Sequence, residues 1–149
     1  MGGDLSASVT AKRDVVVDVR GSVTGAITAG EADTWAIAFV SAGGNVSGEV
    51  KATWGAEVLA RGKVSEAVTG ADGYARVVSG GSVTGAVSST KGEVGMWGWD
   101  GVAGAVSAAD RSVVMTCGSG PEPDEDAEEF ILAVGMRLAR PTNSPRPAG

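Results

Sequence analysis

The sequence predicts an all-β protein, a parallel β-solenoid of about six coils, from three observations. A seven-residue unit, clearest in Gly81–Val87, returns along most of the chain. Each copy alternates apolar residues with small or polar ones, as a half-buried strand does. The 149 residues include 24 glycines together with many valines, which suits short strands joined by tight turns.

The leading apolar residue of each copy marks the register of the repeat. Successive leading residues lie 18, 23, 18, 19 and 19 positions apart. A nearly constant step of this size is typical of stacked repeat proteins. We expect the extra residues of the 23-residue step to form an outward loop near 30–34, which would leave the stack undisturbed. The leading residues are Leu5, Val23, Val46, Val64, Val83 and Val102.

Each repeat divides into two halves that resemble strands. In the first half, two apolar residues flank a small one, as in Val23, Gly25 and Ile27, and this spacing places all three on one strand face. The small residue indicates a close approach, such as the opposite wall of a narrow core. Glu66 breaks this rule, which indicates a coil end or a locally wet interior because an unpaired buried carboxylate is costly. The second halves lie at 15–19, 56–60, 75–79, 94–98 and 113–117.

Strands about every nine residues also fit an antiparallel β-meander or a barrel. A meander does not require successive strand pairs to be alike, whereas a solenoid gives every coil the same environment. Six copies of one pattern therefore favour the solenoid, and the sequence leaves its handedness open.

Residues 1–119 form the predicted repeat domain, and residues 120–149 differ from it. Six acidic residues between Glu122 and Glu129 make an acidic linker. The apolar segment 130–140 alternates as a strand does, although a helix beginning near Asp124 or Asp126 is the alternative. We expect this segment to cap an open end or an apolar side of the stack. The Pro-rich residues 141–149 are predicted to be a flexible tail.

The composition predicts a protein that is not an enzyme and that has no cofactor or metal site. The sequence contains no histidine, which removes Ser-His-Asp and Cys-His catalysis and histidine metal sites. Its single cysteine, Cys117, cannot form an intrachain disulfide. The net charge of −6 disfavours a nucleic-acid partner. No apolar run is long enough to predict a membrane-spanning helix.

Two outward surfaces are candidates for binding. Leu59, Val78 and Trp97 occupy equivalent places in the second halves, and Trp35, Phe39 and Trp99 are expected nearby. Exposed apolar ladders usually mark interfaces, formed here either with the C-terminal segment or with another chain. The predicted interface residues are Leu59, Val78, Trp97, Trp99, Phe130, Leu132 and Val134.

The second surface consists of two outward columns that are mostly Ser and Thr. Stacked, they would form a flat, weakly polar face like an ice-binding or glycan-facing surface, although Lys51 and Glu49 interrupt it. Short polar residues are also the ordinary choice for a solvent face. The columns are Ser6, Thr24, Ser47, Ser65, Thr84 and Ala103, and Thr10, Thr28, Lys51, Thr69, Ser88 and Ser107.

The copies at 21–29, 44–52 and 81–87 resemble the Gly-Asp/Asn/Ser-Val/Ile-x-Gly-x-Val-x-Ala repeats of large bacterial surface or secreted proteins that are expected to form β-solenoids. This resemblance covers about residues 3–119. The sequence is also similar, more weakly, to bactofilins, which are cytoskeletal β-helix polymers. Both resemblances imply structural or adhesive roles without catalysis. They imply a cell-surface or extracellular location, with a cytoplasmic filament as the alternative, and supply no functional residues.

The expected function is therefore a non-catalytic structural or self-assembling module. The first coil, at Leu5–Val9, has too few residues before it to form a cap, which predicts a homo-oligomer or filament joined through coil ends. The alternative is a carbohydrate-binding or adhesive module. Such a module could use Trp54, Trp97 and Trp99 as stacking platforms for glycans.

Overall fold

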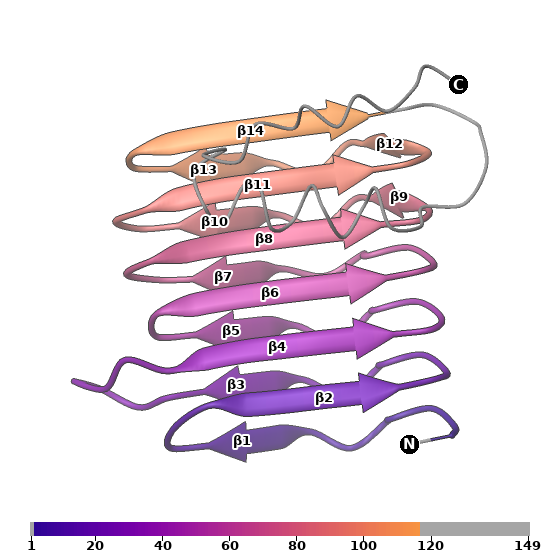
Figure 1. The fold of residues 1–149 in the computed structure, drawn as a ribbon, viewed down its shortest axis with the longest axis horizontal. Coiled ribbons are helices and arrows are strands. Elements are labelled where there is room, and N and C mark those ends of the chain that lie inside the picture. Colours follow the sequence, from indigo (N-terminus) through magenta and orange to yellow (C-terminus); the bar gives the residue numbers. More distant parts are fainter. Residues whose placement is uncertain (1, 117–149) are drawn as a thin grey trace, which may run out of the picture.

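The computed structural model describes residues 2–116, and over this range the chain is a parallel β-solenoid (Figure 1). Every pairing between its strands is parallel, and residues 2–116 contain no helix. The predicted fold class is confirmed, and the antiparallel meander or barrel is excluded. One coil consists of a bridge residue, a short strand and a long strand, and six such coils follow one another.

Two six-stranded sheets form the main faces of the solenoid, and we call them the short-strand and long-strand sheets. In the short-strand sheet the order is β1-β3-β5-β7-β10-β13, and in the long-strand sheet it is β14-β11-β8-β6-β4-β2. The short strands are β1 (Val9–Ala11), β3 (Ile27–Ala29), β5 (Val50–Ala52), β7 (Val68–Gly70), β10 (Val87–Ser89) and β13 (Val106–Ala108). The long strands are β2 (Val15–Val19), β4 (Ile37–Ala42), β6 (Gly55–Ala60), β8 (Tyr74–Ser79), β11 (Glu93–Gly98) and β14 (Arg111–Thr116).

A narrow third ladder connects the two sheets, and the sequence analysis did not separate it from the short strands. Parallel bridges join Leu5 to Val23 and then run through Val46 and Val64 to Val83. The last step pairs β9 (Ser82–Val83) with β12 (Gly101–Val102). The first half of a repeat is therefore not one strand, because the chain bends between the bridge residue and the short strand.

The small residue of each repeat lies at this bend. A Cβ at Gly48 would meet the carbonyl oxygen of Gly25 in the preceding coil, and a Cβ at Gly85 would meet that of Glu66. The close approach is therefore to the backbone of the preceding coil, and the prediction of an opposite core wall was wrong. Glycine allows this approach because it has no Cβ. Glu66, the exception, has an exposed side chain, so no buried carboxylate needs a partner there.

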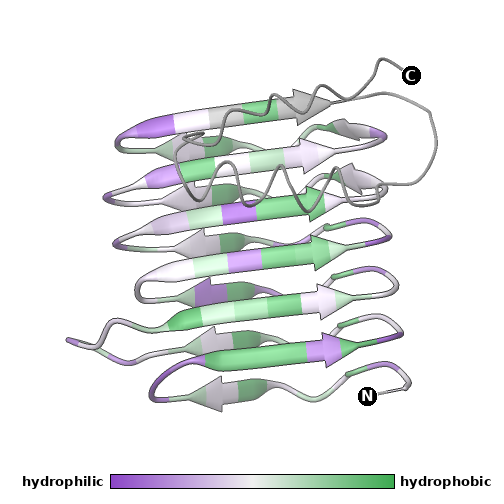
Figure 2. Cartoon of the chain, in the orientation of Figure 1, coloured by the Kyte–Doolittle hydropathy of each residue, from purple (hydrophilic) through white to green (hydrophobic). Residues whose placement is uncertain are grey.

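The core is a stack of small aliphatic columns between the three ladders. One column contains Ile27, Val50, Val68 and Val87, each completely buried, and successive members pair directly across the short-strand sheet. The long strands add alternating residues such as Val40, Val58 and Val77, also completely buried. Figure 2 shows green, apolar segments that recur from strand to strand along the stack. Every interior coil buries equivalent residues in these columns, which explains why apolar residues recur at the same positions of the repeat.

The 23-residue step contains the predicted outward loop. It runs between β3 and β4, and Figure 1 shows it projecting beyond the turns of the other coils. Ile27 still pairs with Val50, and Ile37 still pairs with Gly55, so the insertion leaves both sheets in register. The extra residues therefore change one turn and not the stack.

A ladder of side-chain acceptors locks neighbouring coils at the position before each bridge residue. The Asp4 carboxylate accepts a hydrogen bond from the Ser22 amide at 2.7 Å, and the Ser22 hydroxyl accepts one from the Asn45 amide at 3.0 Å. The Asn45 side-chain oxygen then accepts from the Lys63 amide at 2.8 Å. Asp, Ser and Asn share a short side chain with an oxygen acceptor, which lysine lacks. The ladder therefore stops at Lys63.

Candidate functional site

One candidate surface is the open end of the first coil. The strands β1 and β2 are the terminal strands of their sheets, so each has one neighbour among residues 2–116. Leu5, Val9 and Ala11 point into the core but are only half-buried, whereas Val23, Ile27 and Ala29, one coil further on, are 0–1% exposed. This end therefore presents both apolar side chains and a strand edge.

The backbone groups of Thr10 face away from the stack. The Val9 amide donates to the Ala26 carbonyl oxygen at 2.9 Å, and the Gly30 amide donates to the Ala11 carbonyl oxygen at 2.9 Å. Successive residues of a strand direct their amide and carbonyl groups to opposite sides. The N–H and C=O of Thr10 consequently point out of the open end, where another strand could pair with them.

The second surface is the outer face of the long-strand sheet, where the predicted apolar column is in register. Leu59 pairs with Val78, and Val78 pairs with Trp97. These residues form a small apolar cluster with Trp99, in which Val78 is 1% and Trp97 is 7% exposed. At this exposure little of the Trp97 ring is accessible for the glycan stacking that the sequence predicted. Phe130, Leu132 and Val134, together with the predicted capping segment, lie outside the described residues.

A charged cluster lies beside this apolar cluster on the same face. Arg76 forms an ion pair with Glu57 at 3.4 Å, and its guanidinium lies 3.6 Å from the centre of the Tyr74 ring. The Tyr74 hydroxyl donates to the Glu57 carboxylate at 3.4 Å. Burial raises the pKa of Tyr74, and the Glu57 charge raises that pKa further, against a lowering effect of Arg76. These contacts pair the charged groups with one another, although the buried Arg76 Nε has no hydrogen-bond partner. The paired charges belong to the surface of the sheet.

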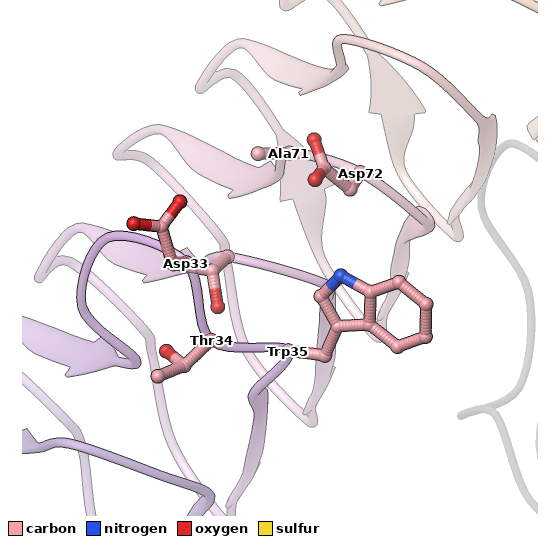
Figure 3. A pocket seen from close by; sticks show the side chains of 6 residues that line it. Asp33, Thr34, Trp35, Ala71 and Asp72 are labelled. Carbon is pink, nitrogen blue, oxygen red and sulfur yellow. The ribbon is translucent and has the colours of Figure 1, made fainter.

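The third surface surrounds the inserted loop, where two hollows of about 370 and 360 Å³ adjoin each other. Asp33, Thr34 and Trp35 line both hollows. Arg13 lines the first, and Thr53, Ala71 and Asp72 line the second. Figure 3 shows Asp33, Thr34 and Trp35 on the loop, with Ala71 and Asp72 on a neighbouring turn. Side chains from four coils thus meet around one loop.

Trp35 is the most exposed large apolar residue of the described chain, at 77%. Its ring lies 5.0 Å from that of Trp54, with 31° between the ring planes. A side chain at Gly73 would meet the Trp54 indole, so Trp54 packs over the backbone of the following coil. The prediction that Trp35 lies near Trp97 was wrong, because Trp35 lies beside Trp54. In the sequence, Trp35 directly follows the insertion, and this position places it beside the turn that contains Trp54.

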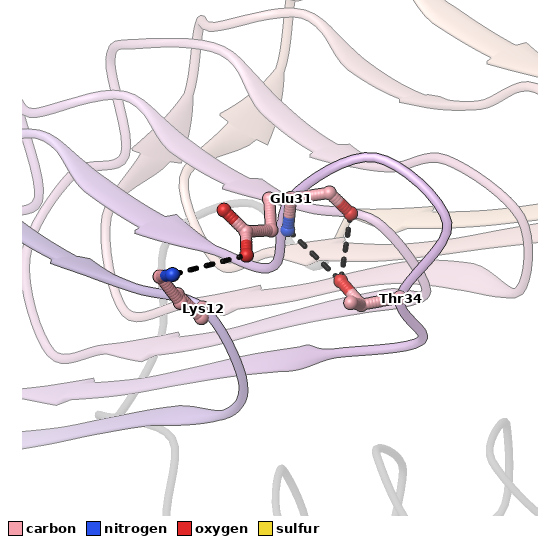
Figure 4. Close-up of polar contacts among 3 residues, drawn as sticks. All are labelled: Lys12, Glu31 and Thr34. Carbon is pink, nitrogen blue, oxygen red and sulfur yellow. Dashed lines mark hydrogen bonds and ion pairs between the residues drawn. The ribbon is translucent and has the colours of Figure 1, made fainter.

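Hydrogen bonds hold the inserted loop in one shape. The Thr34 hydroxyl donates to the Glu31 carbonyl oxygen at 2.7 Å and accepts from the Glu31 amide at 2.9 Å, and Lys12 lies 3.6 Å from the Glu31 carboxylate (Figure 4). Asp33 has φ of 68°, a left-handed conformation that Asp tolerates better than most residues. The Thr53 hydroxyl accepts from the Ala36 amide at 3.0 Å, which fixes the end of the loop. The Trp35 ring is thus presented from a closed turn.

Of the two predicted Ser and Thr columns, the one that begins at Thr10 is in register on the short-strand sheet, and the one that begins at Ser6 follows the bridge residues of the third ladder. Thr10 pairs with Thr28, Thr28 with Lys51, and Thr69 with Ser88. The Thr69 and Ser88 hydroxyl oxygens lie 3.5 Å apart. Lys51 and the neighbouring Glu49 are both exposed, so the column is interrupted where the sequence indicated.

Among residues 2–116, no three His, Cys, Asp or Glu side chains gather closely enough to hold a metal ion. Within the same residues there is no helix of the length and hydropathy that crossing a membrane requires. Comparison of the chain with protein-family models, with curated proteins and with solved structures found no match.

Proposed function

We propose that the protein is a non-catalytic structural module that self-assembles through the open end of its first coil. The observation that carries this proposal is the contrast between Val9, which is half-buried, and its partner Ile27, which is completely buried one coil further on. A second copy seated on this end would bury Leu5, Val9 and Ala11 as the following coil buries their equivalents. Removing apolar surface from water is the main driving force of such association.

The geometry of the edge supports a head-to-head dimer. Two copies related by a twofold axis would place two β1 strands side by side in opposite directions, and a twofold interface uses the same patch twice. Thr10 would then exchange backbone hydrogen bonds with the partner copy. If the other end of the stack also pairs, the same chemistry produces a filament.

A proline at Thr10 tests this proposal with little effect on the fold. Thr10→Pro removes the outward-facing N–H and places a ring at the edge, but it removes no hydrogen bond within the stack. Thr10→Val, the matched control, keeps the N–H and suits a strand. We expect the unmodified protein and Thr10→Val to form dimers or larger species at high concentration in sedimentation velocity, and Thr10→Pro to remain monomeric.

Two results would count against the proposal. One is an unmodified chain that stays monomeric at the highest concentration reached. The other is an assembly that forms equally well in Thr10→Pro, since its interface would then lie elsewhere. Circular dichroism spectra and thermal melts of both variants establish that their solenoids are intact.

A further inference from the structure

We propose that the inserted loop carries a binding site for a neutral oligosaccharide, with Trp35 as its stacking platform. The site consists of the two adjoining hollows lined by Arg13, Asp33, Trp35 and Asp72. This inference is independent of self-assembly, because the site is built by the insertion and not by the open strand edge. It is also distinct from Trp97, whose ring is covered.

Trp35 lies in solvent although its indole is large and mostly apolar. Leaving an indole 77% exposed forgoes much of the free energy that burying it would provide. The chain nevertheless holds this ring outward, on a loop closed by Thr34 and backed by Trp54. The C–H face of a pyranose ring is apolar and flat, so it can pack on such an indole as another apolar ring would.

The Trp35–Trp54 pair is ordered before any ligand binds. Trp54 packs over Gly73, and its amide donates to the Ala36 carbonyl oxygen at 2.9 Å. Trp54 therefore belongs to the rigid stack and supports Trp35 from one side. A ligand that meets an already ordered ring loses less conformational entropy on binding.

Both hydrogen-bond donors and acceptors lie beside the Trp35 ring. Asp33 and Asp72 offer carboxylate acceptors for sugar hydroxyls, and Arg13 offers guanidinium donors across the loop. Lys91 lies 3.3 Å from the Asp72 carboxylate, which offsets part of the negative charge. Charged groups of both signs, which donate and accept hydrogen bonds, suit a neutral polyhydroxylated ligand better than a cation. A cation bound over the Trp35 ring would be the competing ligand class.

The size of the hollows indicates a chain of several sugar units. Each hollow, at about 360–370 Å³, is near the lower end of the range for small-molecule sites, and the two share Asp33, Thr34 and Trp35. A single ring would occupy one side of the loop only. An oligosaccharide passing over Trp35 would contact Arg13 at one end and Asp72 at the other.

The test is a titration of the full chain with cellohexaose, chitohexaose and maltohexaose, in which tryptophan fluorescence and calorimetry measure binding. A methylated peptide that carries trimethyl-lysine serves as the cationic probe. We expect saturable binding of at least one hexasaccharide, weaker binding of the corresponding disaccharide, and at least about a tenfold loss of affinity in Trp35→Ala, equivalent to about 1.4 kcal/mol. Asp33→Asn should weaken binding less, because Asn tolerates the same φ and keeps an oxygen acceptor.

Val16→Ala is the matched control, because Val16 is also a large exposed apolar residue, at 74%, on the neighbouring strand β2. It should leave sugar binding unchanged. The proposal is overturned by a lack of saturable binding to all three hexasaccharides, by equal binding in Trp35→Ala, or by binding of the trimethyl-lysine peptide alone. Sedimentation velocity of Trp35→Ala separates the two proposals, since loss of the sugar site should leave assembly intact.

Discussion

Replacing Val50 and Val9 by alanine in separate variants tests the core and the open end together. The two valines occupy the same column of the short-strand sheet, in coils 3 and 1, and Ile27 lies between them. Val50 is 0% exposed, whereas Val9 is half-buried. The two substitutions remove the same atoms from the same column, so the difference between them isolates the effect of burial.

The expected magnitudes follow from what each side chain loses. Val50→Ala removes two buried carbons, worth about 1.6 kcal/mol of transfer free energy at about 0.8 kcal/mol each. The cavity left between rigid coils adds roughly 1 kcal/mol, so the free energy of unfolding should fall by about 2.5 kcal/mol. Val9→Ala leaves no closed cavity in a single molecule and should cost about 1 kcal/mol or less.

The assay is urea unfolding, followed by circular dichroism, at a low and a high protein concentration. At low concentration the two variants should differ by about 1.5 kcal/mol, which is the difference between the two expected costs. If a second copy covers the open end, association stabilises the folded form by mass action, and Val9→Ala should cost more at high concentration. Val50→Ala should cost the same at both. An equal loss of unfolding free energy in the two variants at low concentration would refute the reasoning, because Val9 at the end of the column would then be as buried as Val50 in its interior.

Further predictions concern the polar groups and the bend. The raised pKa of Tyr74 means that the folded state holds the phenol proton more tightly than the unfolded chain does. Its contribution to the free energy of unfolding is therefore complete below the ordinary pKa of 10.0 and is lost as the pH rises above that value. In urea unfolding across this pH range, Tyr74→Phe should lose less stability than the unmodified protein does. Asn45→Ala removes the acceptor for the Lys63 amide and should lower the free energy of unfolding by about 1 kcal/mol. Asn45→Ser reproduces the acceptor found at Ser22 and should lower it less, which thermal melts of the two variants measure. Gly48→Ala places a Cβ against the Gly25 carbonyl oxygen, whereas the Cβ of Gly81→Ala would have the flexible Lys63 side chain, 3.1 Å away, as its nearest neighbour. Gly48→Ala should therefore destabilise the stack more, and the denaturant midpoints of the two variants measure the difference.

The parts of the fold that repeat could be predicted from the sequence. Leu5, Val23 and Val46 share one register because each coil sees the same neighbours, and the structure places them on one ladder. The insertion at 30–34 could be located because it is the one step that departs from the others. A periodic pattern therefore reports both the stack and the place where the stack is interrupted.

The corners of the coil could not be predicted in the same way. The alternation of Val23, Gly25 and Ile27 fits a straight strand as well as two short ones separated by a bend. Period two reports which residues face inward but not whether the chain turns between them. Glycine is required at position 25 because the Ala7 carbonyl oxygen of the preceding coil lies close to it. In the sequence, such a backbone contact between coils is visible only as a residue without a side chain.

The Trp35 site was missed because it depends on side chains from several coils. Trp35 and Trp54 lie 19 positions apart, which is close to one coil, but the insertion removes Trp35 from the repeat. Trp97 and Trp99 were placed correctly near the Leu59 column, yet their burial depends on packing that alternation does not report. Register predicts which residues become neighbours, and exposure requires the shape of the surface as well.

Specific recognition in such a protein is expected where the repeat is broken. Equivalent coils present similar outer faces, so the Ser and Thr columns offer similar weakly polar groups from coil to coil, except at Lys51 and Glu49. The loop at 30–36 belongs to one coil only, and it brings a left-handed Asp33 and an exposed Trp35 beside Asp72 of a later coil. Within residues 2–116, the open end of the first coil is another place where the environment of a coil changes. Assembly and sugar binding are therefore assigned to different breaks in the repeat, and Thr10→Pro and Trp35→Ala should abolish one each without affecting the other.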